Sequence, residues 1–320
     1  MKSKDWLLFW LVGIIWGTSF LWIRIAVREI SPLMLVSFRT LFALLGLGAF
    51  LLAVRSARAS WGQMRKKLWV FFVLGLINIV APWLLISWAG QHIDSGLSSI
   101  LNSTMPLFTI MISPFFVKDD RFTLKKAVGL LTGFIGVVIL MLPNLGASWS
   151  NHLAAQGAVL LAALCYGSAT VFARKMATGL PPQTQAFLQF VMATTIMWAF
   201  TLGIERPLQF PRLPITWIAL LWLGLLGSGL AYIIYFDLLP RIGPTRMSMV
   251  TYIMPLVAVL LGMIFLGERF HWGAIFGALL ILSGISIVNL RPEKLGRFPA
   301  PETAEGDELD DYGSDLSPVE

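Results

Sequence analysis

Runs of about 20 mostly apolar residues return ten times along this 320-residue chain, and a helix needs roughly that length to cross the hydrocarbon of a bilayer. Charged residues make up only 13% of the chain, whereas a soluble domain carries about 25%. The apolar runs begin at Trp6, Pro32, Leu68, Ser95, Leu124, Leu153, Pro182, Ile215, Pro244 and Phe270. The sequence therefore predicts an all-α polytopic membrane protein with ten transmembrane helices.

The Lys and Arg residues are divided unevenly between alternate loops. If the N-terminus is cytoplasmic, that side carries 18 of them and the opposite side carries five, Arg24, Arg28, Arg206, Arg212 and Arg269. This asymmetry predicts a multi-pass protein of the plasma (bacterial inner) membrane with both termini in the cytoplasm. The bilayer accounts for the basic loops, so no nucleic-acid partner is expected.

Two halves of the chain carry similar residues in the same order. At an offset of 149 residues, Met105-Pro106-Leu107 falls on Met254-Pro255-Leu256, and Trp83 falls on Tyr232. At an offset of 150, Trp16-Gly17-Thr18 falls on Tyr166-Gly167-Ser168; at 148, Gly129 and Gly136 fall on Gly277 and Gly284. The shared order across five spans predicts a duplicated five-helix unit.

Because five is odd, the second copy must cross the membrane the other way up. Inverted repeats are an architecture of secondary transporters, whose substrate site lies near the midplane between the copies. We expect residues 1–5 to be a cytoplasmic N-terminus, 6–142 to be the first repeat and 153–290 to be the second. Residues 300–320 carry eight acids and no Lys or Arg, so we expect 291–320 to be a disordered acidic cytoplasmic tail.

Spans four and nine carry polar residues and prolines where a membrane helix would normally be apolar. In span four the spacing predicts one inward helix face, made of Ser95, Ser99, Asn102, Pro106, Thr109 and Ser113. Pro106 and Pro255 each free a backbone carbonyl, which is tolerable beside a wet cavity. We predict Pro106 and Pro255 as hinges and Asn102 and Tyr252 as substrate-binding residues; helix packing alone is the alternative.

Aromatic residues and one arginine are the other candidates for a substrate site. Trp16, Trp83, Tyr166 and Tyr232 suit a flat or amphipathic organic solute, and Tyr232 shares a face with Ser228 and Tyr235. The alternative is that these aromatic residues anchor the interface or fill the core.

Arg39 lies seven residues past Pro32, about 10 Å along the helix, where a charge is expensive and a functional candidate. It could hold a substrate carboxylate, and we also predict its repeat equivalent, Gln189, as a substrate-binding residue. The alternatives are that Arg39 caps freed helix carbonyls or extends outward to the interface.

Five stretches of the chain resemble EamA-type members of the drug/metabolite transporter superfamily: WGTSFLWIRIAV from Trp16, SPLMLVSFRT from Ser31, NSTMPLF from Asn102, YIMPL from Tyr252 and LGE from Leu266. The resemblance covers about residues 6–290 and implies ten spans in two inverted EamA repeats around a central cavity. It also implies export of amino acids or other small metabolites by alternating access. The first half departs from the pattern, because Lys118-Asp-Asp-Arg121 stands where the second half has Gly267-Glu268.

Other functions remain open at this point. A membrane-embedded enzyme would need a nucleophile, paired intramembrane acids or a zinc signature. His92, His152 and His271 are isolated, so we expect no catalytic residue, metal or cofactor. A non-transporting scaffold is a further alternative, as is an importer of a sugar phosphate, nucleotide sugar or polyamine. The expected partners are a small-molecule substrate and the lipid bilayer, and Gly129-x-x-x-Gly133 leaves a homodimer open.

Overall fold

The computed structural model describes residues 3–54, 61–116, 123–145, 151–177, 179–242, 247, 250–269 and 272–289. Over these ranges the chain forms helices joined by short turns, without strands. In chain order the helices are α1 (Ser3–Ala26), α2 (Pro32–Ala53), α3 (Trp61–Arg65), α4 (Leu68–Leu74), η2 (Gly75–Val80), α5 (Ala81–Ala89), α6 (Ser95–Asn102), α7 (Met105–Phe116), α8 (Leu124–Leu145), α9 (Asn151–Met176), α10 (Pro182–Ile204), α11 (Pro214–Leu221), η3 (Trp222–Leu230), α12 (Ala231–Ile242), α14 (Val250–Leu266) and α15 (Trp272–Asn289).

Seven helical segments of this part of the chain are long and apolar enough to cross a membrane: Ser3–Ala26, Pro32–Ala53, Leu68–Ala89, Ser95–Phe116, Asn151–Met176, Pro182–Ile204 and Pro214–Tyr235. Ile253–Leu266 and Trp272–Ile287 are shorter apolar helices. The expected all-α polytopic membrane protein is therefore confirmed. Where the predicted starts fall on described residues, the helices begin within a few residues of them; Pro244 and Phe270 lie outside the described ranges.

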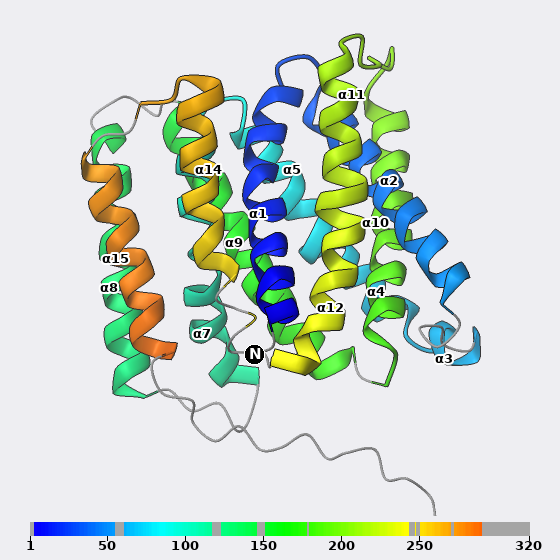
Figure 1. The fold of residues 1–320 in the computed structure, drawn as a ribbon, viewed down its shortest axis with the longest axis horizontal. Helices are drawn as coiled ribbons and strands as arrows, with labels where there is room; N and C mark the ends of the chain where they lie inside the picture. The colour runs from blue at the N-terminus through cyan, green and yellow to red at the C-terminus, as the bar shows by residue number, and fades with distance from the viewer. Residues whose placement is uncertain are drawn as a thin grey trace, which may run out of the picture. The chain divides into compact units, whose positions relative to one another are not determined.

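Helices from the two halves of the chain pack on one another. α8 lies along α15, and α2 lies along α10, as Figure 1 shows. α1, from the first half, packs on α14, α12 and η3 of the second half, while α9, from the second half, packs on α5, α6 and α7 of the first. The main core lies between α2, α5, α10 and α11, with Met34, Phe190 and Leu220 fully buried.

Two spans contain a π-helical segment, η2 in the first half and η3 in the second, and both segments include glycine at equivalent positions. A Cβ on Gly75 of η2 would lie 3.1 Å from the carbonyl oxygen of Gln189. A Cβ on Gly224 of η3 would lie 3.1 Å from the carbonyl oxygen of Arg39. Gly75 and Gly224 are 149 residues apart, and Arg39 and Gln189 are 150 apart, so each half makes the same close contact with the other.

The same exchange of contacts is found at two further pairs of glycines. A Cβ on Gly17 of α1 would lie 2.6 Å from Val257 Cβ on α14, and a Cβ on Gly167 of α9 would lie 3.0 Å from Phe108 Cβ on α7. On helices α8 and α15, which pack against one another, a Cβ added to a glycine of one helix would clash with the backbone of the other. A Cβ on Gly136 would lie 2.6 Å from the Gly277 carbonyl oxygen, and one on Gly284 would lie 2.6 Å from the Gly133 nitrogen. These glycines allow helices of opposite halves to approach closely.

Span four is broken, whereas the described part of span nine is continuous. α6 ends at Asn102 and α7 begins at Met105, so the polar residues predicted to share one helix face from Ser95 to Ser113 lie on two helical segments. The hydroxyls of Ser103 and Thr104 donate to the carbonyl oxygens of Ile100 (2.6 Å) and Leu101 (2.7 Å), which stabilises the break.

Pro255 lies inside α14, and the helix passes through it without a break. At the offset of 149, Tyr252 and Ile253 stand where span four has Ser103 and Thr104. Neither residue offers a short hydroxyl that could bond to a carbonyl one turn back, as Ser103 and Thr104 do.

Candidate functional site

Arg39 lies inside the bundle, on the first third of α2. Its side chain is only 7% exposed, and its Nε donates a hydrogen bond to Ser228 Oγ at 3.2 Å. The hydroxyl of Ser228 in turn donates to the carbonyl oxygen of Leu223 at 2.8 Å. Both residues belong to η3, whose π-helical path changes the usual helix hydrogen bonding. The second half thus holds the arginine of the first.

Trp83 of α5 covers the guanidinium group. The guanidinium carbon of Arg39 lies 3.7 Å from the centroid of the Trp83 ring, the geometry of a cation–π interaction. Tyr166 of α9 lies beside Trp83. Tyr166 and Tyr232 also lie near Arg39. Three predicted aromatic residues therefore surround the predicted arginine.

A chain of aromatic rings continues from Trp83 to α1. Ring centroids are 5.8 Å apart for Trp83 and Phe190, 5.6 Å for Phe190 and Tyr232, and 5.9 Å for Tyr232 and Trp16. The indole of Trp16 donates to the carbonyl oxygen of Gly227 in η3 at 3.0 Å. We call Trp16, Arg39, Trp83, Tyr166, Phe190, Ser228 and Tyr232 the Arg39 cluster.

Acidic side chains of the described ranges stay away from Arg39. Asp237 lies near the end of α12, and the others lie in terminal turns, caps or loops: Asp5, Glu29, Asp94, Glu205 and Glu268. In this part of the chain none of them pairs with Arg39; Asp5 instead pairs with Arg241 at 2.9 Å. The burial and the ring contact contradict the alternative in which Arg39 extends outward. A buried cation without a counter-ion is costly, and binding an anion would offset that cost.

The remaining predicted residues do not all join this cluster. Gln189 accepts a hydrogen bond from Asn78 of η2 at 3.0 Å and donates to the Gln185 carbonyl oxygen at 3.3 Å, so both ends of its amide are already bonded. Asn102 lies at the end of α6, and its buried Oδ1 has no partner in the described structure. The side chain of Tyr252 lies outside what the structure describes.

Sequence reasoning does not identify Phe190 as a member of the Arg39 cluster, nor Gly227 as the hydrogen-bond acceptor of Trp16. Phe190 is one of many phenylalanines in apolar spans and carries no distinguishing signal. Gly227 takes part through its carbonyl oxygen, which accepts a hydrogen bond from the indole N–H of Trp16. Such a contact depends on the π-helical path of η3 and cannot be predicted from the residue type.

A bundle of apolar helices around a buried arginine and aromatic rings defines a polytopic membrane protein with an internal polar cluster. Residues 5–142 and again 154–290 match the EamA-like transporter family. The two matches span most of the chain, which therefore belongs to this family of membrane transporters.

Three named relatives are similar to this chain over most of its length. The chain is 26% identical over 275 residues to the uncharacterized transporter YoaV of Bacillus subtilis, covering 86% of this chain and 92% of YoaV. It is 26% identical over 288 residues to the uncharacterized inner membrane transporter YedA of Escherichia coli K12, covering 87% and 90%. It is 28% identical over 300 residues to PecM of Dickeya dadantii, covering 90% and 92%. A solved crystal structure at 19% sequence identity shares the fold with a TM-score of 0.63, covering 91% of this chain and 98% of that one.

Proposed function

We propose that this transporter exports small metabolites that carry a carboxylate, such as amino acids, by alternating access through a site at the Arg39 cluster. The observation that carries the proposal is the buried guanidinium of Arg39, which has an aromatic cover and a hydroxyl partner but no carboxylate beside it in the described structure. A carboxylate fits a guanidinium in a two-pronged arrangement. The rings of Trp83 and Tyr232 would contact the apolar part of the solute.

We further propose ten spans in two inverted repeats, 6–142 and 153–290, related by an approximate twofold axis in the membrane plane. The exchanged glycine contacts support this arrangement, because a twofold axis makes each contact occur twice with the partners interchanged. The pairs formed by Gly75 with Gln189 and by Gly224 with Arg39 follow that rule. The Arg39 cluster draws residues from both copies, as a shared site between inverted repeats requires.

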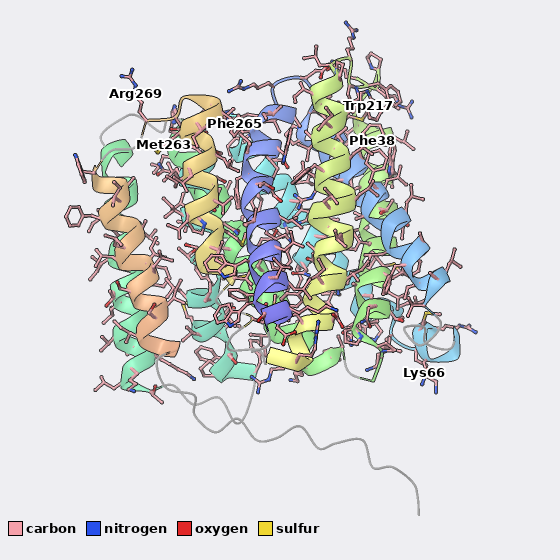
Figure 2. All side chains as sticks on the ribbon, viewed as in Figure 1. Phe38, Lys66, Trp217, Met263, Phe265 and Arg269 are labelled. Carbon is pink, nitrogen blue, oxygen red and sulfur yellow. The ribbon has the colours of Figure 1, made fainter. Side chains whose placement is uncertain are left out.

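The proposed orientation places both termini in the cytoplasm of the inner membrane. Lys66, from the most basic loop, and Arg269 lie at opposite ends of the bundle (Figure 2), as the uneven loop charges require. A homodimer is a separate proposal, which needs its own test. Gly133 and Gly136 are already in contact with Leu107 and with α15, so that part of the glycine face serves packing within the chain.

The test is a thermal-shift series on purified protein with amino acids and the amines that lack only the carboxylate. An amino acid should raise the melting temperature of the wild type, and its amine should not. Arg39→Gln should lose the amino-acid response, while Arg39→Lys should keep a weaker one, because lysine retains the charge without the planar fork. Equal responses to acid and amine, or an unchanged response in Arg39→Gln, would refute a carboxylate site.

A further inference from the structure

A carboxylate joins the ends of two helices from opposite halves of the chain. Gly267, at the end of α14, adopts a left-handed backbone conformation with φ +66°, which a residue with a side chain rarely adopts. The turn brings the N–H of Glu268 back to the carbonyl oxygen of Gly262 at 3.1 Å. The Leu266-Gly267-Glu268 motif therefore fixes where the Glu268 side chain points.

That side chain caps the beginning of α6. Glu268 Oε1 accepts the backbone N–H of Ser95 at 2.8 Å, and Oε2 accepts the Ser95 hydroxyl at 2.9 Å and the N–H of Gly96 at 3.3 Å. A carboxylate at a helix N-terminus is favourable. Asp94, the residue in the N-cap position of α6, makes no such bond with its own side chain. The cap of α6 is thus supplied from the other half of the chain.

Polar atoms without hydrogen-bond partners lie beyond Ser95 on the same face of α6. Ser99 and Asn102 are four and seven residues beyond Ser95, so they share its face of the helix, and Ser95 faces Glu268 and Gly262 of the second half. Ser99 is 1% exposed and Asn102 is 8% exposed. Ser99 Oγ and Asn102 Oδ1 have no hydrogen-bond partner in the described structure. Buried polar atoms without partners are costly, so this face of α6 would favour the binding of a polar solute.

The packing of α14 differs along span four. α14 packs against α6, the half of the span that Glu268 caps, while its contact with α7 is at most marginal in the described residues. Among the described residues, span four is therefore joined to α14 chiefly through α6, at the Glu268 end. Figure 1 shows the end of α14 at the same edge of the bundle as the end of α1.

We propose that Glu268 is a latch that holds α6 to α14 and closes one end of the solute pathway over Ser99 and Asn102. The inference rests on the proposed alternating access. Release of the carboxylate from Ser95 and Gly96 separates the two helices, opens this end, and lets solute pass the face of Ser99 and Asn102. Capture of the carboxylate by α6 closes it again. Glu268 acts by positioning the helices and does not itself bind the solute.

Two variants weaken the latch in different ways. Glu268→Gln removes the charge that the N-terminus of α6 favours. Gly262→Ala keeps the glutamate, but its Cβ would overlap Glu268 Oε2 and lie 2.8 Å from Ser95 Oγ, so the carboxylate must move away. Glu205→Gln is the matched control, because Glu205 also accepts a serine hydroxyl, that of Ser31 at 2.6 Å, but joins α10 to α2.

The experiment measures access to Ser99 and needs no known substrate. The full chain with Cys165→Ser and Ser99→Cys is reconstituted in vesicles and treated with a membrane-impermeant maleimide. Arg269→Cys, exposed at the Glu268 end (Figure 2), reports which vesicles present that end. From that side, Ser99→Cys should react slowly, and Glu268→Gln or Gly262→Ala should each speed the reaction about tenfold, the change expected for losing a charge-assisted hydrogen bond. Glu205→Gln should leave the rate unchanged.

Equal labelling rates in the wild type, Glu268→Gln and Gly262→Ala would overturn the latch, whatever the transported solute is. A disulfide between Ser95→Cys and Gly262→Cys gives a second measurement, in which a covalent cross-link between α6 and α14 takes the place of the Glu268 hydrogen bonds. Oxidation should block labelling of Ser99→Cys, and reduction should restore it. Unchanged labelling after cross-linking would also refute the proposal, whereas failure of the carboxylate thermal-shift test alone would refute only the proposed substrate.

Discussion

The guanidinium carbon of Arg39 lies 3.7 Å above the centre of the Trp83 ring, and the two residues come from α2 and α5. This contact replaces the carboxylate partner that a buried arginine usually has. It keeps the cation in place and leaves its remaining donors for an anion.

Replacing Trp83 should destabilise the free protein through Arg39. Trp83→Leu removes the ring and should lower the free energy of unfolding by about 2–5 kcal/mol, because cavity formation and loss of the cation–π contact both contribute. Trp83→Phe keeps an aromatic face and should lose less than half as much. Thermal unfolding in detergent measures both. The loss of unfolding free energy caused by Trp83→Leu should be smaller when Arg39→Gln is already present. If the losses of the two single variants simply add in the double variant, the two side chains are not directly coupled.

The two glycines of the π-helical segments should tolerate alanine differently. A Cβ at Gly224 would overlap Phe42 Cβ, which cannot swing away, while a Cβ at Gly75 would find its nearest atoms at 3.1 Å. Gly224→Ala should therefore destabilise by about 1–3 kcal/mol, as overpacking does, and Gly75→Ala should cost less. Melting temperatures of the two variants test the order. The reverse order would show that α2 and η3 are not in this close contact.

Glu29 should make stability depend on pH at the turn between α1 and α2. Its carboxylate accepts hydrogen bonds from the Thr216 hydroxyl and from the backbone N–H groups of Arg212 and Leu213, at the beginning of α11. The Thr216 bond, with smaller backbone contributions, lowers the pKa of Glu29 below its ordinary value of 4.5. Because the folded-state pKa is lowered, the ionised carboxylate stabilises the protein above about pH 4.5 and loses that effect as the pH falls through the folded-state value.

Melting temperatures between about pH 6 and pH 3 check this prediction for Glu29. Glu29→Gln should melt lower than the wild type near neutral pH, and the difference should narrow on acidification. Other carboxylates titrate in both proteins, so the difference between the two curves is the informative quantity. A constant difference across the whole range would contradict the expected role.

Helix starts could be predicted from the sequence, because local signals determine them. Pro32 begins α2 as expected, and Ser31 accepts the N–H of Met34 at 3.1 Å as its cap. Five residues of the Arg39 cluster could also be proposed, since a charge or a repeated aromatic inside an apolar span is conspicuous: Trp16, Arg39, Trp83, Tyr166 and Tyr232. The π-helical segments and the Gln189–Asn78 bond could not be predicted, because they depend on how helices from different halves meet.

Pro106 and Pro255 were predicted as equivalent hinges, but their surroundings now predict different responses to alanine. Span four is already broken, with Ser103 and Thr104 bonding the exposed carbonyls, so Pro106→Ala should change stability little. Pro255 lies inside continuous α14, and alanine there can supply the missing N–H, which should stabilise by about 1–3 kcal/mol. Thermal unfolding of both variants distinguishes these expectations. A larger gain for Pro106→Ala would mean that the proline, and not the hydroxyls, maintains the break.

The central claim is that a carboxylate solute crosses the membrane through the Arg39 cluster, and counterflow in proteoliposomes tests it most directly. Vesicles preloaded with an unlabelled amino acid that shifts the melting temperature should take up the labelled form transiently. Wild-type protein should give this overshoot. Arg39→Gln, reconstituted at the same density and with the same folded fraction, should reduce it to the level of empty vesicles. An overshoot of the same size in Arg39→Gln would contradict the account.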